Sequence, residues 1–395
     1  MPKKTRISDQ TAILLTMAVL ALVLRMPITG VGSLITTIRA DLGVSNTVMG
    51  ILTSVPMMVF AVISPLTTLV ARRFGMGRSI LSALILILIG ELVRSYTNAA
   101  GLFIGTAIMG CGIGIINVLG LTLIKLRATP ERVGMVTSIY STTMATTAAI
   151  SIAASVPIAL ALGWRNSLAA WVPLAVLAIV VWGIQFRRPE NQLPSNSQQR
   201  PSLKKLLGSP LAWQITLFMG AQTMIFYCIT GWFPTILQSR GFTVEQAALA
   251  ATILQITTLP FTFIVPILIR RIRLPILLGA SNFFVSAGLL LFILNPSPLS
   301  NYAAVMIMAV GMGGIFSVSN LCYSLRTRNA ADTAALTGMA NCFGYVVAAF
   351  GPPVMGRLFD FTQSWLPSLL FLAAILVVNI IFSQLSARDR YLFED

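Results

Sequence analysis

Twelve apolar stretches, each close to the ~20 residues that a helix needs to cross a bilayer, divide this chain. Only 10% of its residues are charged, whereas a soluble domain carries about 25%. We therefore expect an all-α, polytopic membrane protein with 12 transmembrane helices. The expected spans are residues 11–37, 45–71, 77–96, 100–124, 134–162, 166–186, 211–237, 244–269, 274–294, 301–325, 333–356 and 365–386.

One long polar segment, residues 187–205, separates the sixth span from the seventh and is rich in Pro, Ser, Asn and Gln. This composition is typical of a flexible linker. We expect an N-terminal six-helix lobe at residues 1–188, a cytoplasmic linker at 189–210 and a C-terminal six-helix lobe at 211–395.

The two lobes repeat in sequence with an offset of 201 residues, which relates Thr29 to Thr230 within two Ile-Thr-Gly triplets. The same offset relates further pairs, namely Pro65 and Pro266, Arg72 and Arg273, Gly110 and Gly311, Gly112 and Gly313, and Arg127 and Arg328. Because each lobe has an even number of spans, the copies are expected to share an orientation and to form a pseudo-twofold repeat about the membrane normal.

The basic residues predict the orientation. With the N-terminus inside, 21 of the 27 Lys and Arg residues fall on the inner side and only 4 on the outer side. Cytoplasmic loops carry such an excess, so both termini are expected in the cytoplasm. The net charge of +16 is spread over these short loops. No exposed domain carries a basic face, and we expect no binding of nucleic acid.

Arg25 lies in the stretch LRMPITGVG, residues 24–32, inside the first span. Counted from Thr11 at ~1.5 Å per residue, it is ~21 Å along a helix that crosses a ~30 Å hydrocarbon core. An arginine at that depth costs ~2.5–3.5 kcal/mol, so it needs a partner, either a side chain or a transient anion. Its counterpart in the repeat is Phe226, so the charge belongs to one lobe only.

Glu91 lies at a depth that matches Arg25, but Arg94 follows it on the same helix face. We expect a local Glu91–Arg94 pair near the outer surface, in a structural or coupling role. That pair leaves Arg25 for an anion, or for nitro or carboxylate oxygens that match the planar guanidinium.

The chain resembles the major facilitator superfamily over its whole length, beginning with the basic turn LVARRFGMGR at residues 69–78, which lacks the usual aspartate of that turn. Four stretches resemble its cyanate/2-nitroimidazole permease branch more specifically: residues 24–32, 117–125 continuing into 129–140, 324–332 and 344–356. The resemblance implies a multi-pass protein of the bacterial inner membrane.

The resemblance also implies that the first, fourth, seventh and tenth spans line a central cavity, flanked by the second, fifth, eighth and eleventh. Polar and aromatic residues at mid-depth on these spans are then the substrate-binding candidates, although hydrogen bonding between helices is an equal alternative for each. They are Arg25, Thr29, Asn117, Tyr140, Gln222, Tyr227, Gln255, Asn320, Tyr323, Asn341 and Tyr345.

Two glycine runs, at residues 109–114 and 310–314, lie inside apolar spans without a phosphate-binding lysine, so we expect close helix packing there. Four prolines, Pro65, Pro266, Pro352 and Pro353, are expected to kink their helices. The four cysteines show no ligand spacing, so neither a metal nor a cofactor is expected.

The Arg25 pattern and the repeat predict a secondary active transporter that moves a small anionic or polar planar organic solute by alternating access, and the resemblance implies a solute similar to cyanate or a nitroimidazole. The alternative is a proton-coupled multidrug or metabolite exporter of the same fold, with Glu91 as the acid. An enzyme is not expected, because the chain has no histidine and no nucleophile–base pair. The expected partners are a small-molecule substrate and the lipid bilayer, with the protein as a monomer.

Overall fold

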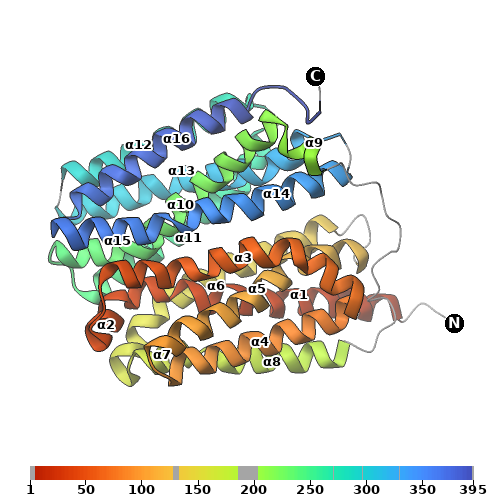
Figure 1. Cartoon of the computed structure of the whole chain (residues 1–395), viewed down its shortest axis with the longest axis horizontal. Helices are drawn as coiled ribbons and strands as arrows, with labels where there is room; N and C mark the ends of the chain where they lie inside the picture. The colour runs from red at the N-terminus through yellow and green to blue at the C-terminus, as the bar shows by residue number, and fades with distance from the viewer. Residues whose placement is uncertain are drawn as a thin grey trace. The chain divides into compact units, whose positions relative to one another are not determined.

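The computed structural model describes residues 5–127, 133–185, 203–269, 271–295, 297–328 and 330–393. Within these ranges the chain forms α-helices and no β-strand (Figure 1). The helices are α1 (Thr5–Thr29), α2 (Val31–Leu42), α3 (Asn46–Phe74), α4 (Met76–Tyr96), α5 (Ala99–Arg127), α6 (Val133–Leu162), α7 (Trp164–Ala169), α8 (Val172–Gln185), α9 (Leu203–Leu207), α10 (Pro210–Ser239), α11 (Val244–Leu268), α12 (Leu274–Leu294), α13 (Pro298–Leu325), α14 (Ala330–Ala349), α15 (Gly351–Thr362) and α16 (Leu366–Ser386).

Among the described residues, 11 helical spans are long and apolar enough to cross a membrane, or 12 if the bent pair α1–α2 counts as one span. Two of these spans also contain a break, because α7 and α8 form one span and α14 and α15 another. The short helix α9 precedes α10 and is not a span. The prediction of an all-α protein with 12 transmembrane helices is confirmed.

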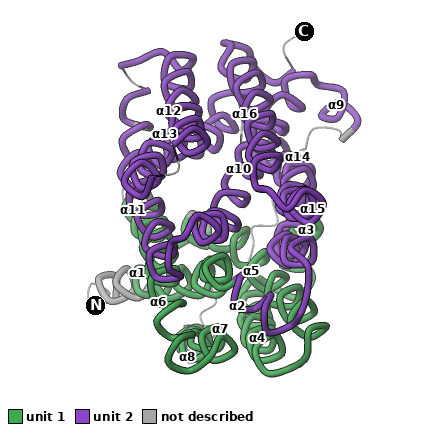
Figure 2. Tube along the Cα trace, turned by 90° about the vertical axis from the view of Figure 1, so that its left-hand side faces the viewer, with its two compact units in different colours: residues 1–34, 62–195 green, residues 35–61, 196–395 purple. Residues whose placement is uncertain are grey.

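The helices group into two compact units (Figure 2). Unit 1 comprises Met1–Leu34 and Val62–Ser195, and unit 2 comprises Ile35–Ala61 and Asn196–Asp395. Helix α3 therefore contributes its first half to unit 2 and its second half to unit 1.

In unit 1, α4 packs along α5 and α1 along α6, while α8 contacts both α4 and α1. The core includes Leu20 and Leu24 of α1 and Ile87 of α4, all buried. Trp182 of α8 is fully buried, and its indole nitrogen donates to the carbonyl oxygen of Gly77 at 2.9 Å.

Unit 2 repeats these pairings with the helices that the 201-residue offset relates. Here α12 packs along α13 and α10 along α14, while α16 contacts both α12 and α10 (Figure 1). The internal repeat in the sequence is thus also a repeat of helix packing.

Small residues bring the helix backbones together, as the glycine runs predicted. In α5, Gly112 lies directly against the backbone at Ala83 of α4. In α13, Gly311 lies against α12 at Ser281, and Gly313 lies against α11 at Thr258. A side chain at any of these glycines would force the helices apart.

The prolines behave in two ways. Pro352 and Pro353 lie in the first turn of α15, directly after the interruption between α14 and α15. By contrast, Pro65 and Pro266 lie within α3 and α11, which continue past them. A proline fits the first turn of a helix because its missing N–H has no partner there in any case.

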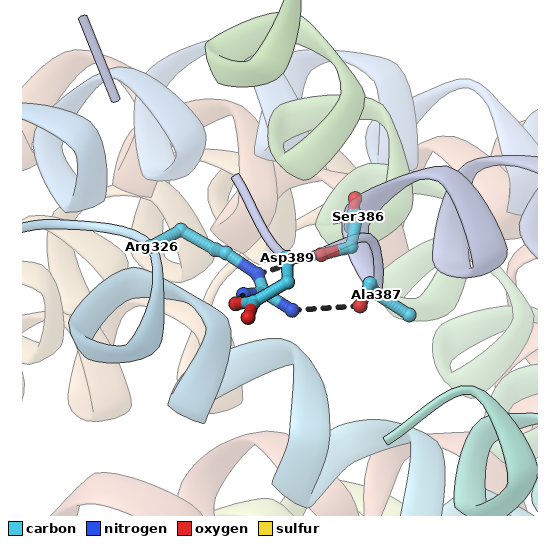
Figure 3. A network of polar contacts seen from close by, with 4 residues as sticks. All are labelled: Arg326, Ser386, Ala387 and Asp389. Atoms are coloured by element: carbon cyan, nitrogen blue, oxygen red, sulfur yellow. Dashed lines mark hydrogen bonds and ion pairs between the residues drawn. The ribbon is translucent and has the colours of Figure 1, made fainter. Parts of the chain in front are cut away.

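The segment after α16 is held to unit 2 by Arg326, which follows α13 (Figure 3). Its guanidinium donates to the carbonyl oxygens of Ser386 at 3.0 Å and Ala387 at 2.7 Å, and to the carboxylate of Asp389 at 2.9 Å. Carbonyls at the end of a helix lack partners within the helix, so Arg326 caps the C-terminus of α16.

Candidate functional site

The first span is broken directly after the candidate Arg25. Helix α1 ends at Thr29 and α2 begins at Val31, with a bend of 41° between them. Pro27 lies inside α1, where it supplies no N–H, and Gly30 stands at the break. The chain therefore changes direction within about one turn of Arg25.

The carbonyl groups at this break are satisfied by side chains. Carbonyls in the last turn of a helix have no partner within it. The hydroxyl of Ser151 on α6 donates to the Met26 carbonyl oxygen at 2.6 Å, and the guanidinium of Arg94 on α4 donates to that of Pro27 at 2.6 Å. Side chains of two other helices of unit 1 therefore stabilise the break between α1 and α2.

Arg25 itself is half-buried. Among the residues that the structure describes, its guanidinium makes no hydrogen bond and no ion pair. It lies close enough to Tyr140 for the two side chains to interact electrostatically. A cation in this setting has its donors available for an anion.

Tyr140 comes from α6 and is 3% exposed. Its hydroxyl has no hydrogen-bond partner within the described part of the chain. This hydroxyl lies beside Gly120 of α5, where a methyl group in place of the glycine hydrogen would stand 3.1 Å from the hydroxyl oxygen. Asn117 is half-buried three residues earlier on the same face of α5.

Thr29 uses its hydroxyl within unit 1. The oxygen lies 3.0 Å from the Arg25 carbonyl oxygen and 3.4 Å from that of Ala148. A hydroxyl has one proton to donate and keeps two acceptor positions. Thr29 therefore helps to hold the break and can offer a ligand only an acceptor.

In unit 2, two candidate tyrosines come together. Tyr323 of α13 is buried and lies close enough to Tyr345 of α14 for electrostatic interaction. The Tyr345 ring meets Phe60 of α3 edge to face, with ring centroids 5.6 Å apart. Phe60 was missed from the sequence because an apolar residue in an apolar span gives no signal of its own.

The other candidates of unit 2 occupy separate positions. Gln222 is buried on α10 and accepts a hydrogen bond from Thr223 at 3.3 Å, and Tyr227 packs edge to face with Phe226 at 5.5 Å. Gln255 on α11 is half-buried, and its amide oxygen has no partner among the described residues.

Two asparagines complete the set. Asn320 is exposed and donates to the Phe316 carbonyl oxygen of its own helix at 2.9 Å. Asn341 is half-buried on α14.

Glu91 and Arg94 are the two residues expected to form a local pair. Both are buried and interact electrostatically, but both Glu91 oxygens lack a hydrogen-bond partner within the described residues. Arg94 donates instead to the carbonyl oxygens of Pro27 and of Leu168 in α7, at 2.6 and 3.2 Å. The two side chains therefore interact through their charges without a hydrogen bond, while the guanidinium bonds to carbonyls that the breaks in two spans leave free.

The family follows from comparison with known proteins. A family model described as the Major Facilitator Superfamily matches residues 17–352. The chain belongs to the Major Facilitator Superfamily. It is therefore a multi-pass membrane transporter, as the resemblance in its motifs predicted.

Three relatives of this major facilitator are bacterial transporters. The chain is 37% identical to the uncharacterized transporter YycB of Bacillus subtilis, covering 94% of this chain and 92% of that protein. It is 35% identical to the 2-nitroimidazole transporter of Escherichia coli, covering 98% of each. It is 23% identical to the cyanate transport protein CynX of Escherichia coli, covering 96% of this chain and 98% of that protein.

Solved structures agree on the fold of this major facilitator. The crystal structure of a D-xylose-proton symporter matches with a TM-score of 0.75 at 16% identity, covering 95% of this chain and 96% of that one. At this identity the match supports the fold alone.

Proposed function

We propose that this major facilitator is a secondary active transporter that moves a small anionic or polar planar organic solute, similar to cyanate or a nitroimidazole, across the inner membrane by alternating access. The observation that carries the proposal is the Arg25 guanidinium, half-buried and without a protein partner among the described residues. The names of two relatives, a 2-nitroimidazole transporter and a cyanate transport protein, support the same solute class.

The geometry around Arg25 suits oxygen-bearing or anionic ligands. A guanidinium offers a planar fork of N–H donors that matches carboxylate and nitro oxygens. The Tyr140 hydroxyl, which interacts electrostatically with this guanidinium, lacks a hydrogen-bond partner among the described residues. Because a buried polar group without a partner costs about 1–3 kcal/mol, a ligand that accepts from this hydroxyl removes the cost.

The ring contact of Tyr345 with Phe60 in unit 2, together with Tyr323, which interacts electrostatically with Tyr345, supports the planar part of the proposal. Aromatic rings favour flat partners through offset stacking or edge-to-face contact. We assign these rings, with Gln222, Tyr227 and Gln255, to a second group of solute contacts. Asn341 is assigned to the same role, and Asn320 is the weakest candidate, because its amide donates to its own helix. Asn117, three residues before Gly120 on α5, is assigned to the group around Tyr140 in unit 1.

The remaining parts of the proposal follow from the sequence. The charge bias supports cytoplasmic termini, and the offset repeat supports lobes at residues 1–188 and 211–395 joined by a linker at 189–210. We propose that the protein acts as a monomer, carries out no enzymatic reaction and binds no nucleic acid.

Ligand-induced thermal stabilisation of the purified protein tests the proposed site. The panel contains cyanate, 2-nitroimidazole and small planar carboxylates, each measured with the wild type and with Arg25→Ala. A ligand at ~100 times its Kd stabilises a protein by ~2.7 kcal/mol. We expect one class to stabilise the wild type and not Arg25→Ala. Equal stabilisation of a folded Arg25→Ala protein would assign Arg25 a structural role and overturn the proposed site.

A proton-coupled multidrug or metabolite exporter of the same fold is the second candidate. The observation in its favour is Glu91, a fully buried acid whose oxygens have no hydrogen-bond partner in the described residues and which interacts electrostatically with Arg94. Transport that depends on external pH in the wild type, but not in Glu91→Gln, would support this candidate. The same pH dependence in both proteins would exclude coupling through Glu91.

A further inference from the structure

Arg94 is a buried arginine that connects two broken spans of unit 1. It is 1% exposed on α4, and its guanidinium donates to Pro27 in the last turn of α1 and to Leu168 in the last turn of α7. Each of these helices is followed at once by a second helix of the same span. One side chain therefore caps the carbonyls of two helix ends.

The backbone that carries Arg94 is fixed by close helix packing. Gly105 of α5 lies directly against the Arg94 backbone, and Gly90 of α4 lies against α5 at Gly105 and Met109. A side chain at either glycine would collide with the opposite backbone. The guanidinium thus extends from a fixed point to the break in the first span.

The acceptor at that break lies two residues after Arg25. The carbonyls of Arg25, Met26 and Pro27 each receive a side-chain donor, from Thr29, Ser151 and Arg94. Of these donors, only Arg94 is charged, and charge-assisted hydrogen bonds are roughly twice as strong as neutral ones. The contacts from Ser151 on α6 and Arg94 on α4 orient the last turn of α1, and the Thr29 contact lies within that turn.

We propose that Arg94 is a positioning residue for the solute site. It holds the last turn of α1 in a position from which the Arg25 side chain can contact the same ligand as the Tyr140 hydroxyl. The inference rests on the proposed function, in which Arg25 binds the solute. Arg94 itself does not contact the solute in this proposal, because its two terminal nitrogens donate to Pro27 and Leu168. Glu91 balances the charge of Arg94 without competing for those donors.

A purely structural arginine would affect unfolding but not affinity, and the chain provides a matched control. Arg240 follows α10 in unit 2, and its guanidinium donates to the Phe292 carbonyl oxygen in the last turn of α12 at 2.7 Å and to the Asn301 side chain at 2.6 Å. It caps a helix end as Arg94 does, but its hydrogen bonds do not involve the break beside Arg25.

The test measures the Kd of 2-nitroimidazole and of cyanate by titration calorimetry, together with the unliganded Tm, for the wild type, Arg25→Gln, Arg94→Gln, Arg94→Lys and Arg240→Gln. We expect Arg94→Gln to raise the Kd at least tenfold for the probe that binds the wild type. Arg94→Lys, which keeps the charge but has a single donor nitrogen, should recover part of this loss. Arg240→Gln should lower the Tm and leave the Kd within twofold.

A folded Arg94→Gln protein with the wild-type Kd overturns the inference. If Arg25→Gln abolishes binding while Arg94→Gln does not weaken it, the inference fails and the proposed function stands. If neither these two probes nor the planar carboxylates of the panel above bind the wild type, or if Arg25→Gln binds as the wild type does, the proposed function fails and the inference fails with it.

A second variant covers the case in which Arg94→Gln does not fold because Glu91 is left as an uncompensated buried charge. The double variant Glu91→Gln/Arg94→Gln removes both charges and should fold with the Kd raised tenfold or more. If the double variant binds with the wild-type Kd, or if it also fails to fold, Arg94 contributes only to the stability of the fold. Either result overturns the inference.

Discussion

At the scale of single residues, the site in unit 1 combines polar groups that have no hydrogen-bond partner in the described part of the chain. The Tyr140 hydroxyl is buried without a partner in the described residues, and Arg25 has none there for its guanidinium. Such groups lower stability unless a ligand supplies the missing contacts. Two such groups within electrostatic range of each other are expected where a small polar molecule binds.

Tyr140→Phe tests whether the unsatisfied Tyr140 hydroxyl lowers stability and contributes to ligand binding. Removing the hydroxyl takes away an unsatisfied group and leaves the ring in place, so we expect unchanged or higher stability, by up to about 1 kcal/mol. Ligand affinity should fall several-fold, because one hydrogen bond to the solute is lost. Thermal unfolding with and without 2-nitroimidazole measures both effects.

The matched variant is Tyr302→Phe in unit 2, because the Tyr302 hydroxyl donates to the Gln246 carbonyl oxygen at 3.2 Å and Tyr302 belongs to no proposed group of solute contacts, so its affinity should stay unchanged. A Tyr140→Phe protein that loses stability and keeps its affinity would show that the hydroxyl serves packing and has no contact with the solute.

Residue patterns in the sequence predicted that Arg25 lies inside the first span without an acidic partner. They could not predict the role of Arg94. The i, i+3 spacing correctly places Glu91 and Arg94 near each other. Which carbonyls the guanidinium would reach depends on the breaks at residues 30 and 170–171, and these depend on tertiary packing. Local spacing does not contain that information.

At the scale of helices, the start of α3 is capped by a carboxylate from far along the chain. The Asp360 side chain on α15 accepts from the Asn46 backbone and side chain, at 3.1 and 2.8 Å, and from the Thr47 backbone and side chain, at 2.8 and 2.6 Å. An anion here satisfies free N–H groups and complements the helix dipole. In the proposed lobe division, rocking of the lobes would have to break these four bonds.

Asp360→Asn tests this cap. The amide has one acceptor oxygen and no charge, so we expect a loss of about 1–2 kcal/mol in the free energy of unfolding. The comparison is Asp389→Asn, whose carboxylate is 90% exposed and bonds to Arg326, a guanidinium held by two carbonyls as well. Denaturant unfolding should show a clearly smaller effect at Asp389, and equal effects would contradict a specific role for Asp360.

The helices themselves were largely predictable, and their long-range contacts were not. Apolar length identified the spans, and Pro352 and Pro353 marked the interruption between α14 and α15. The contact of Asp360 with Asn46 joins residues 314 positions apart, and no periodic pattern extends over that distance. The same reason hid Phe60, whose place beside Tyr345 depends on how α3 packs in unit 2.

At the scale of the whole molecule, the repeat is the feature that connects sequence and fold. The 201-residue offset predicted two related halves, and the pairings of α4 with α5 and of α1 with α6 recur as α12 with α13 and α10 with α14. The two halves differ at the proposed solute site, because the counterpart of Arg25 in the second half is Phe226. A single cation in one half suits an asymmetric solute.

Uptake by proteoliposomes tests the central claim, that this chain transports a small anionic or planar solute through a site containing Arg25. The measurement compares counterflow of labelled 2-nitroimidazole and cyanate by the wild type, Arg25→Gln and the control Arg240→Gln. We predict saturable uptake of at least one solute by the wild type and Arg240→Gln, and at least a tenfold loss in Arg25→Gln. Uptake by a folded Arg25→Gln protein at the wild-type rate and half-saturation would contradict the account.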